Sequence, residues 1–149
     1  MSTQFPLKEK STQYGYGLLA LLILFCFRVG AQALQRWAPV NFLPPFENWH
    51  SGALPYELLL VSQFIIIAIC VTLVVRFFKN GIFPNRKTGQ IYLLIGIVYF
   101  SVMLFRMTAG LTFARDHVWF GAIIPTLFHL VLAAFVLLMG HFHYKFGAK

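Results

Sequence analysis

The chain has 149 residues, of which 59% are hydrophobic and only 11% are charged. A soluble domain is typically about 45–50% apolar and about 25% charged, so this composition excludes an ordinary soluble protein and indicates an integral membrane protein. The formal net charge of +8 does not indicate nucleic-acid binding, because the cations lie at the ends of the apolar runs and not on one polar face.

Four apolar runs occupy most of the chain. A membrane-spanning helix needs about 20 predominantly apolar residues, and each run is long enough. Prolines and glycines punctuate the segments between the runs. The sequence therefore predicts an all-α membrane protein with one domain, residues 1–149, in which four transmembrane helices form a bundle. The predicted spans are residues 16–37, 56–78, 90–110 and 118–140.

The cations flanking the spans predict the orientation. Lysines and arginines gather before the first span, between the second and third, and in the C-terminal tail, whereas the other two loops hold three of the four acids. Cytoplasmic segments of membrane proteins are enriched in Lys and Arg. We therefore expect both termini to be cytoplasmic and the protein to lie in the inner membrane of a bacterium.

A secretory signal peptide is a competing interpretation of the N-terminal region. Lys8 and Lys10, the apolar stretch after them and Ala31-Gln32-Ala33 imitate its three parts. Arg28 interrupts the apolar stretch just before the cleavage motif, which argues against cleavage.

The first outer loop, residues 38–55, combines four prolines with several large apolar side chains. Prolines disfavour a long helix here, and the apolar side chains favour the membrane interface. We expect a flap over the mouth of the bundle, with Phe46 and Trp49 forming a docking surface for a partner.

Polar side chains recur inside the apolar runs. Ionisable groups inside a membrane are costly, usually face the protein interior and mark function. Arg28, Gln32 and Gln35 are spaced at i, i+4 and i+7, so they share one face of the first helix. The other helices contribute Gln63, Tyr99, Arg106 and His129, with Glu57 at the start of the second span.

These groups predict a partly hydrated, positively charged pocket that opens outward. The expected ligand-binding residues are Arg28, Gln32, Gln63, Tyr99, Arg106 and His129. Two arginines and few acids favour an electron-rich guest, such as a quinone carbonyl, a lipid head group, a carboxylate or a sulfur oxyanion. The alternative is that the same side chains only hydrogen-bond the helices together, with Arg106 reaching toward the interface.

The cysteines and the remaining histidines predict no metal centre. Cys26 and Cys70 both lie inside apolar runs. His129 and His143 lack partner histidines on a second helix, which argues against a bis-histidine haem. A site formed by His50 and His117 with Glu47 or Asp116 remains an alternative, because all four lie in the outer loops.

Two segments, FRVGAQAL in the first span and LPYELLLVSQFIIIAI at the second, resemble the DoxX/MauE group of small four-helix membrane proteins. The resemblance implies a partner-dependent, redox-related or quinone-linked membrane component, and it carries Arg28 and Gln63 over as functional positions. Gln63 stands where that group usually has a glutamate, which puts the transfer of any activity in doubt.

Three functions remain open. The first is an accessory subunit of a larger membrane complex, with a membrane-protein partner or a second copy of the chain. The second is a binding protein or enzyme for a lipophilic ligand, a quinone or a lipid, in which His129 is the candidate proton carrier. The third, a small transporter, is disfavoured by the apolar inner halves of the spans.

Overall fold

The computed structural model describes residues 4–79 and 81–148. In this part of the chain the regular elements are all helices, as the sequence predicts: α1 (Gln4–Trp37), α2 (Phe46–Trp49), α3 (Tyr56–Phe78), α4 (Arg86–Leu111) and α5 (Ile123–Phe146). The four longer helices are long and apolar enough to cross a membrane.

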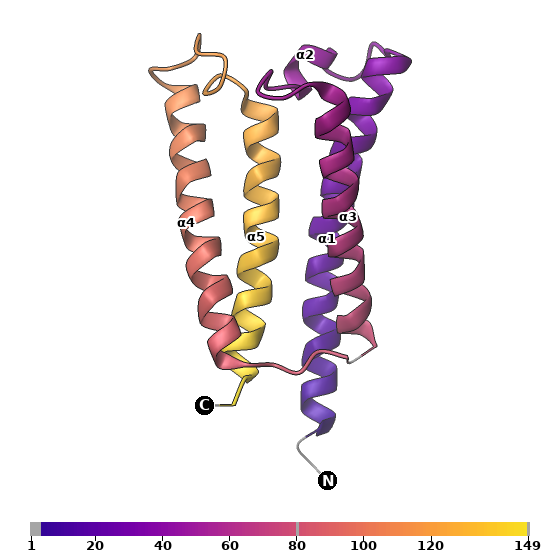
Figure 1. The fold of residues 1–149 in the computed structure, drawn as a ribbon, viewed down its shortest axis with the longest axis vertical. Coiled ribbons are helices and arrows are strands. Elements are labelled where there is room, and N and C mark those ends of the chain that lie inside the picture. Colours follow the sequence, from indigo (N-terminus) through magenta and orange to yellow (C-terminus); the bar gives the residue numbers. More distant parts are fainter. Residues whose placement is uncertain (1–3, 80, 149) are drawn as a thin grey trace.

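The helices form two pairs that stand side by side (Figure 1). The pair α4 and α5 and the pair α1 and α3 meet where α5 packs on α1. Both termini lie at one end of the bundle, which we call the terminal end, and α2 lies at the other, which we call the loop end. This arrangement follows from an even number of long helices that alternate in direction.

The helix bounds differ from the predicted spans except in α3. Helix α1 begins at Gln4, and its N-terminal extension is tied down by Ser11 Oγ, which donates a hydrogen bond to Phe77 O over 2.8 Å. Helix α5 begins at Ile123 and continues past Gly140 to Phe146. Gly140, where the predicted span ends, is a packing position in the interior of this helix.

Glycines bring α4 and α5 close together. A Cβ on Gly89 would lie 2.7 Å from Tyr144 Cα, one on Gly96 would lie 2.7 Å from Leu137 Cδ2, and one on Gly140 would lie 2.8 Å from Leu93 N. Small residues at a helix interface allow this backbone approach, which is the usual way that membrane helices associate. The pair α4 and α5 is therefore closely packed along much of its length.

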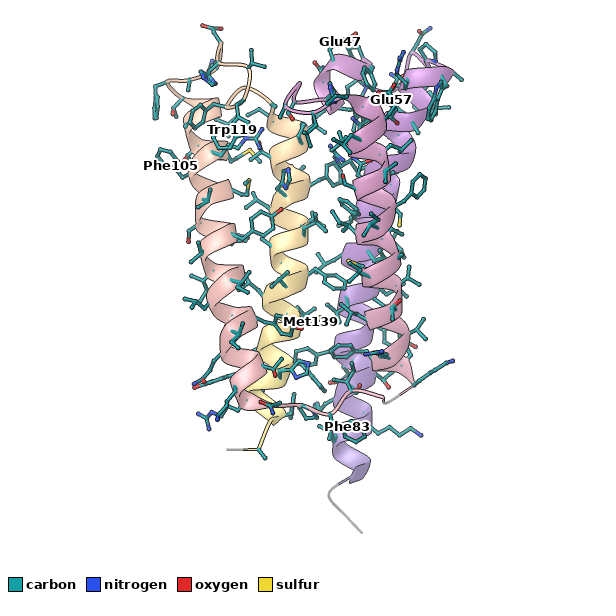
Figure 2. The ribbon with its side chains drawn as sticks, in the orientation of Figure 1. Glu47, Glu57, Phe83, Phe105, Trp119 and Met139 are labelled. Atoms are coloured by element: carbon teal, nitrogen blue, oxygen red, sulfur yellow. The ribbon has the colours of Figure 1, made fainter. Side chains whose placement is uncertain are left out.

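The hydrophobic core lies toward the terminal end, between α1, α3 and α5. Met139 extends from α5 toward α1 and α3 at this level (Figure 2). The core comprises Leu18, Leu22, Cys70, Val74, Phe77, Phe135, Met139 and Phe142. Because large side chains fill this half, the space between the two pairs is closed toward the terminal end.

Many large apolar side chains face outward. Phe105, for example, is 60% exposed and extends away from the bundle (Figure 2). Ile65 on α3 and Ile23 on α1 are similarly exposed. Contiguous apolar surface of this extent is unusual for a protein in water and is expected for one surrounded by lipid.

Candidate functional site

A cavity of about 270 Å³ lies between the two helix pairs toward the loop end. Its wall is mostly apolar, with Phe25, Leu59 and Phe128 among the lining residues. Four polar side chains of the predicted site also line it, one from each long helix: Arg28, Gln63, Arg106 and His129. The structure thus brings together residues that are far apart in the chain, as their common depth in the spans predicts.

Arg28 enters the cavity wall from α1. Its side chain is buried, 6% exposed, and Nη2 donates to Trp49 O over 3.3 Å. Its guanidinium carbon lies 5.9 Å from the centre of the Phe128 ring. Nε is buried and has no hydrogen-bond partner. An unpaired donor on a buried charge is expensive in a membrane, so this nitrogen is available to an acceptor.

Arg106 is held in the wall by Trp119. It is 2% exposed, and its Nε and Nη2 donate to Trp119 O over 3.0 and 2.7 Å. Its guanidinium carbon lies 4.3 Å from the centre of the Trp119 ring. One carbonyl and one aromatic face thus fix the guanidinium. Figure 2 places Trp119 at the loop end, beside α4 and α5.

Among the described residues, none of those that line the cavity carries a carboxylate. All four acids of the chain, Glu9, Glu47, Glu57 and Asp116, have exposed side chains. The hydrogen bonds of Arg28 and Arg106 go instead to backbone carbonyl oxygens. Carbonyls satisfy donors but do not neutralise charge, so the cavity wall carries two positive charges that no acidic side chain balances.

Gln63 lines the cavity, and Gln32 stands behind it. Gln63 Nε2 donates to Gln32 Oε1 over 3.2 Å, and both side chains are almost fully buried. Gln32 Nε2 and Gln63 Oε1 have no partner. If the oxygen and nitrogen atoms of both side-chain amides were exchanged, the two glutamines would still share one hydrogen bond. One donor and one acceptor would still be free. Gln32 therefore positions Gln63 and does not itself form the cavity wall.

Tyr99 positions His129 from behind the cavity wall, as Gln32 positions Gln63. The Tyr99 hydroxyl and His129 Nδ1 are 2.6 Å apart, and only His129 lines the cavity. This hydrogen bond occupies one ring nitrogen and orients the imidazole, leaving Nε2 for another partner. Of the six predicted ligand-binding residues, four form the wall and two support it from behind.

The loop of residues 38–55 is folded around Gln35, which the sequence places on the polar face of the first helix. Gln35 Nε2 lies within hydrogen-bond distance of the carbonyl oxygens of Val40, Leu43 and Pro44, and Gln35 Oε1 accepts from Val40 N over 2.8 Å. Gln35 therefore satisfies backbone groups of a loop that prolines keep from forming a long helix.

Trp49, predicted as part of a docking surface, is buried, with 4% of its surface exposed. Its Nε1 donates to Pro44 O over 2.8 Å, and its ring stacks on Phe128 with the centroids 6.4 Å apart. Phe46 is half-buried and packs edge-on against Tyr56. A tryptophan can occupy either an interior or a surface position, because its ring is apolar and its nitrogen can donate a hydrogen bond. The sequence around Trp49 does not indicate which of the two positions it occupies. Trp49 thus packs against two residues of the cavity wall, Arg28 and Phe128.

The two loop histidines, His50 and His117, do not line this cavity. His50 and His117 line a second cavity together with Glu47 and Asp116, at the surface between the two outer loops. Among the residues that the structure describes, no group of three or more potential ligands is placed to hold a metal ion.

Several parts of the site carry no sequence signal. The carbonyl of Trp119 is a backbone group, and Ser62 and Phe128 are ordinary residues for a membrane helix. The nearest indication was the aromatic character of Trp119, since arginines commonly stack on aromatic faces.

Comparisons of the chain with protein-family models, with curated proteins and with solved structures found no match.

Proposed function

We propose that this protein binds an amphipathic, lipophilic ligand in the cavity, with an electron-rich head against Arg28 and Arg106. One observation carries the proposal: two buried guanidiniums line a single mostly apolar cavity to which the described part of the chain contributes no carboxylate. Side chains that only join helices would be expected to satisfy one another. Here Arg28 Nε and Gln63 Oε1 are buried without partners.

The orientation of the protein in the membrane is part of this proposal. The loop end faces the outside and the termini face the cytoplasm, because the cations gather at the terminal end and between α3 and α4. The cavity then lies in the outer half of a bacterial inner membrane. A quinone carbonyl, a lipid head group, a carboxylate and a sulfur oxyanion all meet the chemistry of the wall.

Native mass spectrometry of protein extracted gently from its own membranes tests the proposal. Ser62 lines the cavity, so Ser62→Phe is expected to fill it and to remove a retained small mass that the wild type carries. Val61→Phe is the matched control, because Val61 is 57% exposed on the outer surface. Equal retention of the small mass by wild type and Ser62→Phe would refute the proposed site.

Membership of a larger membrane complex is the second candidate. It rests on apolar side chains that remain exposed around the loop end, of which Phe42 at 81% and Phe113 at 79% are the most prominent. The same spectra test it, because a stoichiometric protein partner would appear as a large added mass. A partner without a small mass would favour this candidate over the ligand-binding proposal.

A further inference from the structure

The charge of the cavity wall narrows the chemistry of the ligand. Arg28 and Arg106 are permanently charged, because guanidinium groups do not lose their proton in proteins. Both are more than nine-tenths buried, and none of the described residues that line the cavity is acidic. A neutral head, such as a quinone carbonyl, accepts hydrogen bonds but leaves the charge uncompensated. An oxyanion accepts hydrogen bonds and also compensates the positive charge.

The free donors also suit an oxyanion. Arg28 uses Nη2 on Trp49 O, whereas its Nε is buried and unpartnered. Carboxylates and phosphates present two or more oxygens that match the spaced donors of a guanidinium. The donor–acceptor pair of Gln63 and Gln32 lies on α3 and α1 and offers further hydrogen bonds to the head or to its ordered water.

The packing of the helices shows where a chain can leave. In the described residues the backbone of α3 comes close only to that of α1 among the helices, and the backbone of α4 only to that of α5, so α3 and α4 do not pack on each other. Ser62 on α3 and Arg106 on α4 nevertheless line the same cavity. The loop end is covered by Ser51, Leu54 and Trp119, and the terminal end is closed by the hydrophobic core. The remaining route runs between α3 and α4, toward the lipid.

The volume of the cavity limits how much of the ligand lies inside. At about 270 Å³ it falls just below the roughly 300–1,000 Å³ of common small-molecule sites. It therefore suits a head group with the first part of one chain, and not the head and two chains of a phospholipid. The rest of the chain would lie against exposed apolar residues, such as Phe105 on α4 and Ile65 on α3.

We infer that the ligand is a single-chain amphiphile with an oxyanion head, which enters from the bilayer between α3 and α4. This inference rests on the proposed function and specifies its ligand class. A carboxylate and a phosphate monoester share the required chemistry.

Equilibrium binding of radiolabelled probes to the delipidated protein in nonionic detergent tests the inference. The probes are dodecanoate, dodecyl phosphate and the neutral dodecan-1-ol. Binding to Ser62→Phe measures partition into micelles, and the difference from the wild type is the cavity component. We expect at least one anion to bind about tenfold or more tightly than the alcohol. Hexadecanoate should bind at least as tightly as dodecanoate, because a chain that leaves the cavity tolerates extension.

Arg106→Gln supplies the charge test. It should weaken anion binding about tenfold or more, because a charge-assisted contact is lost, and it should weaken binding of the alcohol several-fold less, because the alcohol carries no charge. Equal affinities for anions and alcohol, or no effect of Arg106→Gln, would overturn the oxyanion inference while the proposed site stands. Rejection of hexadecanoate would overturn the lateral route.

The failure of the inference and that of the proposed function remain distinguishable. If none of the probes shows a cavity component while native mass spectrometry still finds a mass that Ser62→Phe removes, the ligand class is wrong and the site is right. If that mass is absent as well, both proposals fail.

Discussion

Replacing Arg28 with methionine is expected to keep or raise the stability of the protein while it removes the ligand. A charge at the centre of a membrane helix costs roughly 2.5–3.5 kcal/mol, and a hydrogen bond to a charged group contributes roughly 1.5–3 kcal/mol. Within the described residues Arg28 donates one side-chain hydrogen bond, at 3.3 Å to Trp49 O. The loss of that bond should therefore be offset by the loss of the buried charge, as happens when apolar residues replace buried ions in other proteins.

The measurements are the midpoint of thermal unfolding in detergent and the occupancy of the retained small mass. Occupancy should fall at least tenfold, whereas the midpoint should stay within a few degrees of the wild type or rise. Arg36→Met is the control, because Arg36 is exposed near the end of α1 and does not line the cavity. If Arg28→Met instead lowers the yield of folded protein and leaves the occupancy unchanged, Arg28 serves only to join the helices.

Gly89→Val is expected to have the largest effect on folding of any single change considered. A side chain at Gly89 would meet the backbone of Tyr144 and His143, with its Cβ 2.7 Å from Tyr144 Cα. Backbone atoms cannot rotate away, so α4 and α5 must separate near their terminal ends. We expect a loss of at least about 3 kcal/mol, seen as little monodisperse protein on size-exclusion chromatography and a lower unfolding midpoint.

Gly30→Ala is the matched control for this prediction. Gly30 is also inside a helix, but a Cβ there would meet nothing within 4 Å. Alanine is favoured over glycine in a helix by roughly 0.8–1 kcal/mol, so Gly30→Ala should be neutral or slightly stabilising. A similar loss in both variants would mean that helix propensity, and not the close approach of α4 and α5, determines the outcome.

The helical fold was predictable because it depends on the length and polarity of continuous runs. A bilayer requires every long span to satisfy its own backbone hydrogen bonds, so an apolar run of sufficient length indicates a helix. Boundaries were less predictable. Helix α5 begins after a loop in which Gly121 N donates to His117 O, and such turns depend on contacts with other segments.

The cavity was partly predictable from the level at which the polar residues lie along the predicted spans. Residues at one level of adjacent spans can meet, and Arg28, Gln63, Arg106 and His129 do line one cavity. Their spacing does not say which residue forms the wall and which supports it. Gln32 shares a helix face with Arg28, yet it lies behind Gln63, because its place also depends on how α3 packs against α1.

The roles in the outer loop could not be predicted in the same way. Gln35 continues the helical spacing of Arg28 and Gln32, but it lies where α1 meets the loop, and it binds backbone carbonyls there. Trp49, which the sequence predicts in a docking surface, has a buried side chain. Both outcomes depend on the path of the loop, which four prolines restrict without determining.

The most direct measurement of the central claim is photo-crosslinking from inside the cavity. p-Benzoylphenylalanine in place of Phe128, which lines the cavity, is compared with the same replacement at Phe105, which is 60% exposed. After irradiation in native membranes, mass spectrometry of the intact protein should show one dominant small adduct at position 128, and adducts of the bulk phospholipids at position 105. The same phospholipid mixture at both positions would contradict the claim that the cavity holds a specific ligand.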